Sequence, residues 1–215
     1  MRTEPSIFVE GKDDEHAILH LVMRHGLTKE TLSRFPRIEP SGGKDGVLEA
    51  IEAAVSAGTD RTLGFVLDAD ENLGDTWRAV ASRLARVNVP VPGEIPKEGF
   101  VDVSSRYRTR VGVWIMPDNE RAGELEDFLE SLVDVGNPLL PHAQESTNRA
   151  KLLGAAFPDA KTGKAVLHAW LAWQNNPGRP YGTAIKSGYL RHDSAAAGRF
   201  VAWFRQLFAM EGPTT

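Results

Sequence analysis

The sequence contains no cysteine among its 215 residues. Disulfide bonds, thiolate metal sites and cysteine nucleophiles are therefore excluded. No apolar run approaches the roughly 20 residues that a membrane-spanning helix needs. The N-terminus also lacks the apolar core of a signal peptide. We therefore expect a cytoplasmic protein with no membrane partner.

The sequence also lacks the net positive charge that marks many nucleic-acid-binding proteins, since its formal net charge is −4. The charges are unevenly distributed. Residues 1–139 contain 16 Lys and Arg against 25 Asp and Glu, whereas residues 140–215 contain 9 against 4. This asymmetry indicates either that the C-terminal part contacts a polyanion such as nucleic acid, or that the two parts attract each other.

Strand and helix patterns alternate along the first 135 residues. Apolar runs predict strands at 6–9, 62–67, 99–103 and 110–116, the third of them at an edge. Apolar residues at helical spacing predict helices at 13–26, 47–58, 75–86 and 123–133. This alternation predicts an α/β fold, with a mostly parallel sheet and helices on both faces.

The pattern changes after residue 136. Helices are predicted at 146–157, 163–174 and 195–210, with a loop at 175–182 and a loose tail at 212–215. Trp170, Trp173 and Trp203 fit either a helical core or a surface that stacks bases. We therefore predict two domains, an α/β domain at 1–136 and a helical C-terminal extension at 137–215 that packs on it.

Acidic residues follow three of the predicted strands, namely Glu10, Asp68, Asp70 and Asp118. In open parallel sheets, ligands bind outside the carboxyl ends of the strands. Asp68 and Asp70 are two residues apart, so in an extended chain both point to the same side. Carboxylates suit Mg²⁺ or Mn²⁺, and a divalent ion relieves their mutual repulsion. These four acids are therefore candidate metal ligands.

Each acid also has a simpler interpretation. An Asp-x-Asp pair can cap a helix or begin a turn, and Asp13 fits a helix cap better than a ligand. With Asp118, the acids Glu124, Glu126 and Asp127 could supply a second metal. Glu124 and Glu126 also lie in the first turn of a predicted helix, where the helix dipole favours acids.

Four residues are candidate phosphate contacts, namely Lys12, Gly43, Lys44 and Lys164. Gly43 and Lys44 immediately precede a predicted helix, where free backbone N–H groups attract anions. The segment 41–44 lacks the full P-loop pattern, so an ordinary turn is the alternative. Lys12 and Lys164 fit solvated surface charges equally well.

Two segments resemble the signature motifs of the Toprim fold: residues 7–14, Ile-Phe-Val-Glu-Gly-Lys-Asp-Asp, and residues 65–70, Phe-Val-Leu-Asp-Ala-Asp. This fold is shared by topoisomerases, bacterial primases, OLD-family nucleases, recombination-repair proteins and a 5S-rRNA maturase. Residues 113–119 and 123–128 resemble stand-alone bacterial Toprim-like proteins of unknown function. The resemblance covers roughly residues 5–135.

The resemblance implies that Glu10 is a general acid/base or metal-linked residue, and that Asp68 and Asp70 hold Mg²⁺. No tyrosine lies in a recognisable topoisomerase setting, and no ATPase motif is present, which leaves phosphodiester cleavage of DNA or RNA. Two alternatives stay open. One is a non-catalytic module that binds nucleic acid or protein partners; a homo-oligomer is left open for the chain in either case. The other is a small-molecule phosphatase.

Overall fold

The computed structural model describes residues 4–32 and 34–208. The first part of the chain contains β1 (Ser6–Val9), α1 (Lys12–Arg24), β2 (Arg37–Pro40), α2 (Lys44–Ser56), β3 (Thr62–Asp68), α3 (Leu73–Arg86), β4 (Phe100–Val103), β5 (Arg110–Met116) and α4 (Leu125–Glu130). The second part contains α5 (Leu139–Leu152), the 3-10 helix η1 (Asp159–Lys161), α6 (Thr162–Ala172), α7 (Tyr181–Lys186) and α8 (Ala195–Phe208). None of the helices described is long and apolar enough to cross a bilayer.

The five strands form one sheet in the order β2-β1-β3-β5-β4. All neighbouring pairs are parallel except β4 and β5, so β4 is an antiparallel edge strand. The central strands β3 and β5 are almost entirely buried, as their near-continuous apolar sequences require in a sheet covered on both faces. The predicted α/β class with a mostly parallel sheet is confirmed.

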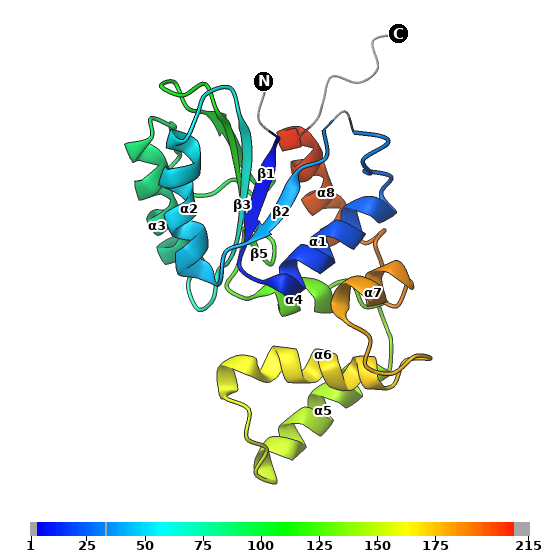
Figure 1. The fold of residues 1–215 in the computed structure, drawn as a ribbon. Helices are drawn as coiled ribbons and strands as arrows, with labels where there is room; N and C mark the ends of the chain where they lie inside the picture. Colours follow the sequence, from blue (N-terminus) through cyan, green and yellow to red (C-terminus); the bar gives the residue numbers. More distant parts are fainter. Residues whose placement is uncertain (1–3, 33, 209–215) are drawn as a thin grey trace.

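Helices cover both faces of the sheet (Figure 1). Side chains alternate along the strands, so Phe65 and Leu67 join a core with α2 and α3, whereas Val66 joins the core on the opposite face. That second core contains residues of α1, α6, α7 and α8. The last helix therefore packs directly on the sheet beside the first.

A pair of glycines lets α8 approach the sheet closely. Gly64 on β3 lies opposite Gly112 on β5. A Cβ atom on Gly112 would lie 2.6 Å from Cδ2 of Leu207, and one on Gly64 would lie 3.1 Å from the same atom. These two positions in otherwise apolar strands thus leave room for the leucine side chain.

Three elements differ from the sequence prediction. Residues 37–40, where the apolar pattern predicts no strand, form strand β2, which is only partly buried. Helix α5 begins at Leu139 and ends at Leu152, whereas the predicted helix spans 146–157. The earlier start is possible because Pro141 lies in the first turn, where a proline is compatible with a helix. Helix α7 starts within the predicted loop. The end of the predicted helix 195–210 and the tail 212–215 lie outside the described residues.

The C-terminal part contacts the rest of the protein through its core and through ion pairs. Basic side chains after residue 139 pair with acids before it. These pairs include Lys161–Glu124, Lys164–Asp13, Arg191–Asp134 and Arg199–Glu120, at 3.3, 2.8, 2.7 and 2.8 Å. The opposite charges of the two parts therefore attract each other within the fold, whereas the division into domains at residue 136 stays a prediction.

The shared core predicts the effect of a mutation in α8. Phe200 is fully buried and contacts Trp114 and Phe128. We expect Phe200→Ala to lower the free energy of unfolding by about 3–5 kcal/mol, because it leaves a cavity between helix and sheet. Urea denaturation measures this change. Val135→Ala, at a side chain 98% exposed, is the control and should have little effect. A small effect of Phe200→Ala would mean that α8 is not part of the core.

Candidate functional site

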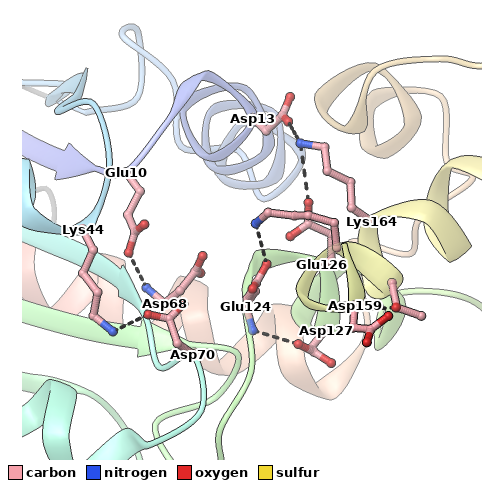
Figure 2. A network of polar contacts seen from close by, with 12 residues as sticks. Glu10, Asp13, Lys44, Asp68, Asp70, Glu124, Glu126, Asp127, Asp159 and Lys164 are labelled. Atoms are coloured by element: carbon pink, nitrogen blue, oxygen red, sulfur yellow. Dashed lines mark hydrogen bonds and ion pairs between the residues drawn. The ribbon is translucent and has the colours of Figure 1, made fainter. Parts of the chain in front are cut away.

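The parallel strands β1 and β3 are neighbours and end at the same edge of the sheet. Glu10 follows β1, and its Oε1 accepts a hydrogen bond of 2.9 Å from the backbone N–H of Asp68, the last residue of β3. The predicted proximity of Glu10 and Asp68 is therefore present in the structure. Figure 2 shows this bond and the acidic side chains around it.

The carboxylate of Asp68 is the least compensated group at this edge. Its Oδ1 atom is buried and has no hydrogen-bond partner within the part of the chain that the structure describes. Burial raises the pKa of Asp68 to about 9, and the nearby carboxylates of Glu10, Asp14, Glu126 and Glu124 act in the same direction. Asp68 therefore strongly favours a proton or another positive charge.

Burial also raises the pKa values of two neighbouring acids, Glu10 and Asp14. Burial raises the pKa of Glu10, and the bond from Asp68 opposes this effect only in part. Burial also raises the pKa of Asp14 to about 7. Its Oδ2 accepts a 2.9 Å bond from the N–H of Gly11, which is the N-cap residue of α1. The prediction that Asp13 is the cap was wrong, because α1 already begins at Lys12; Asp13 lies in the first turn and pairs with Lys164.

Asp70 differs sharply from Asp68. Strand β3 ends at Asp68, and Asp70 has a left-handed φ of 54°. The rule that puts residues i and i+2 on one side applies to extended backbone and fails here. The Asp70 side chain is half exposed and pairs with Nζ of Lys44 at 2.6 Å. In Figure 2 its carboxylate is turned toward Lys44.

A backbone bridge brings the loop before α4 to the same place. The Asp70 N–H donates to Gly123 O at 3.0 Å, and the Gly123 N–H donates to Asp70 O at 2.8 Å. Gly123 has a φ of 141°, and a Cβ atom there would lie 2.7 Å from Oδ2 of Asp127. That carboxylate accepts a 2.7 Å bond from the Glu124 N–H. Glycine is therefore required for this junction, which places Glu124 beside the aspartates.

Side chains of the C-terminal helices contact the acid cluster at Glu126. Glu126 of α4 is 8% exposed and accepts a 3.3 Å bond from the hydroxyl of buried Tyr181. Nζ of Lys164 lies 3.8 Å from the Glu126 carboxylate and 2.8 Å from that of Asp13. Burial and the Glu126 charge raise the pKa of Tyr181 far above its ordinary value. Sequence reasoning missed Tyr181, because only folding brings α7 to α4.

The other predicted residues divide into two groups. Gly43 donates its N–H to Glu10 O at 2.9 Å, and so lies in the site together with Lys44. Lys12 is exposed and pairs with Glu15. Asp118 accepts bonds from the N–H groups of its own turn and pairs with Arg121 at 2.9 Å. The role of Asp118 as a metal ligand stays a prediction. The ion pair with Arg121 opposes it, because the carboxylate already has a partner.

A cleft of about 610 Å³ opens beside Asp70, Glu124 and Glu126. Its lining residues are Lys44, Ala69, Asp70, Glu71, Asn72, Asp75, Thr76, Gly123, Glu124, Glu126, Asp127, Ala160 and Gly163. Within residues 4–32 and 34–208, however, no three Asp, Glu or His side chains are grouped closely enough to hold one metal ion. The acids thus interact electrostatically without forming a preassembled ligand set.

Comparison with known proteins gives the family. The family model described as "Protein of unknown function (DUF3226)" matches residues 4–209. The chain belongs to the DUF3226 family. No curated protein and no solved structure is significantly similar to it. Because the matched region extends from β1 to the end of α8, the DUF3226 fold includes the C-terminal helices as well as the sheet.

The raised pKa of Asp68 predicts how the stability of this DUF3226 chain depends on pH. Between the ordinary Asp value and about 9, the folded protein binds a proton that the unfolded chain releases. The free energy of unfolding should therefore fall as pH rises through this range. Asp68→Asn removes this pH-dependent contribution. Its free energy of unfolding, compared with that of the wild type, should therefore rise by at least about 1 kcal/mol between pH 5 and pH 9.

Urea denaturation at pH 5, 7 and 9 in EDTA measures this difference. Glu49→Gln, which changes an exposed acid of α2, is the control and should follow the wild type at every pH. Equal pH dependence in Asp68→Asn and wild type would show that Asp68 is ionised and compensated in the folded protein.

Proposed function

We propose that this DUF3226 chain is a Mg²⁺- or Mn²⁺-dependent phosphodiesterase that acts on nucleic acid. The observation that carries the proposal is the buried, unpartnered Oδ1 of Asp68, surrounded by other carboxylates. A buried charge without a partner is strongly unfavourable, so a proton or a cation must compensate it. A divalent cation would compensate several of these carboxylates at once.

The chemistry of the donors fits such an ion. Asp68 and Asp70 would hold it, with Glu10 beside them, and all three offer the oxygen ligands that Mg²⁺ and Mn²⁺ prefer. When bound, the ion would stabilise the negative charge that develops on a phosphodiester during cleavage. This assignment agrees with the Toprim resemblance, because the Glu and Asp-x-Asp motifs follow adjacent strands.

The protein's own side chains would supply the proton transfer and part of the phosphate binding. Burial raises the pKa of Glu10 above its ordinary value, which makes its carboxylate a stronger proton acceptor for general acid–base catalysis. The Asp68 N–H fixes the orientation of that carboxyl group. Lys44 lines the cleft and presents an ammonium group to it. A phosphate in the cleft would therefore meet a cation on one wall.

The preference for nucleic acid rests on the C-terminal part. Several of its cations are engaged with acids, but among the described residues Arg149, Arg179 and Lys186 form no ion pair within 4 Å. These three side chains are available to contact the phosphates of a longer polyanion.

A cleavage assay on labelled single- and double-stranded DNA and RNA tests the proposal. Wild-type protein should cut at least one substrate with Mg²⁺ or Mn²⁺ and none in EDTA. Asp68→Asn and Glu10→Gln should each lower the cleavage rate by at least about 100-fold. Even mutation of a residue that only hydrogen-bonds to a metal ligand typically lowers activity 10–100-fold. Glu49→Gln should keep full activity.

Two outcomes would contradict the proposal. Binding of nucleic acid without cleavage, unchanged in Asp68→Asn, would indicate a non-catalytic module. Release of phosphate from nucleotides without strand scission would indicate a small-molecule phosphatase.

Asp118→Asn, run in parallel, tests the remaining predicted ligand. Loss of activity in that variant would mean that Asp118 leaves Arg121 in the active protein.

A further inference from the structure

Lys44 interacts with only one acid of the Asp-x-Asp pair. Its Nζ donates hydrogen bonds of 2.6 Å to Oδ2 of Asp70 and of 2.6 Å to the hydroxyl oxygen of Thr76. By contrast, the buried Oδ1 of Asp68 has no hydrogen-bond partner in the described parts of the chain. Of the two aspartates, Asp70 is therefore compensated by an ammonium group and Asp68 is not.

The position of Lys44 is set by the same network that builds the acid cluster. Lys44 is the first residue of α2, and the preceding Gly43 donates its N–H to Glu10 O. Thr76 is buried on α3, and its hydroxyl donates to Ala69 O at 3.1 Å. The threonine oxygen is thereby oriented to accept from Lys44. The ammonium group thus has an anchor that does not depend on Asp70.

This arrangement has a consequence for any divalent cation shared by the two aspartates. An ammonium 2.6 Å from Asp70 and a divalent ion on the same carboxylate would repel each other, because like charges at short range are unfavourable. Resting on the proposed function, we infer that Lys44 is an internal competitor of the divalent cation for Asp70. Binding of the ion breaks the Lys44–Asp70 pair, and Lys44 stays at the cleft wall on Thr76.

The missing ligand set fits this inference. No group of three acids among the described residues is arranged to hold a metal, and the Asp70 carboxylate is turned to Lys44 (Figure 2). Release of Asp70 from Lys44 would free it to turn toward Asp68. An ammonium has three N–H donors, of which Asp70 and Thr76 use two. Lys44 would then offer two donors to a phosphate in the cleft instead of one.

Isothermal titration with Mn²⁺ alone tests the competition. Lys44→Met and Lys44→Gln should bind Mn²⁺ about threefold to tenfold more tightly than the wild type, because a partly exposed ion pair no longer has to be broken. Lys44→Arg keeps the charge and should bind no more tightly than the wild type. Lys97→Met removes an ammonium that pairs with Glu120, also at 2.6 Å, outside the cluster. It should leave the affinity unchanged.

Thermal unfolding gives a second readout that a purely structural role would not change. Saturating Mn²⁺ should raise the unfolding midpoint of Lys44→Met by more than that of the wild type. Equal or weaker Mn²⁺ binding in folded Lys44→Met and Lys44→Gln, with clear binding by the wild type, would overturn the competition and leave the proposed function standing. Absence of Mn²⁺ binding in all variants would overturn the proposed function and the competition together.

Discussion

The burial of negative charge at the carboxyl edge of the sheet is the constraint on which the site depends. Parallel pairing of β1 and β3 brings Glu10 and Asp68 to one edge, where the Glu10 carboxylate accepts the Asp68 N–H. Burial then raises the pKa of both groups. A protein tolerates such a cluster only when protons or cations compensate it, since uncompensated buried charge is strongly destabilising.

The surrounding elements compensate the cluster unequally. Lysines reach its margins: Lys44 pairs with Asp70, Lys161 with Glu124, and Lys164 with Asp13. In the described structure no lysine reaches the Oδ1 atom of Asp68 at the centre. The chain itself therefore compensates the margins, whereas the Oδ1 atom of Asp68 at the centre has no partner among the described residues. This contrast distinguishes the cluster from an ordinary surface network of ion pairs.

The C-terminal helices are as much a part of this site as the sheet. Tyr181 and Lys164 reach Glu126 from α7 and α6, and α8 packs on the sheet above Gly64 and Gly112. The DUF3226 match, which spans residues 4–209, covers all of these elements. A function assigned to the strand-end motifs alone would therefore omit residues that shape their electrostatic environment.

The sequence by itself determined the α/β class, the central strands β3 and β5, and the acids that follow β1 and β3, because apolar periodicity reports burial directly. It did not determine β2, whose half-exposed residues give a weak pattern. Only the tertiary structure decided that Asp14 rather than Asp13 accepts the N–H of Gly11, the N-cap residue of α1, and that Asp70 turns to Lys44. Only folding, likewise, brings Tyr181 to Glu126. These contacts depend on side-chain directions and on pairings between residues distant in the chain, which local patterns do not encode.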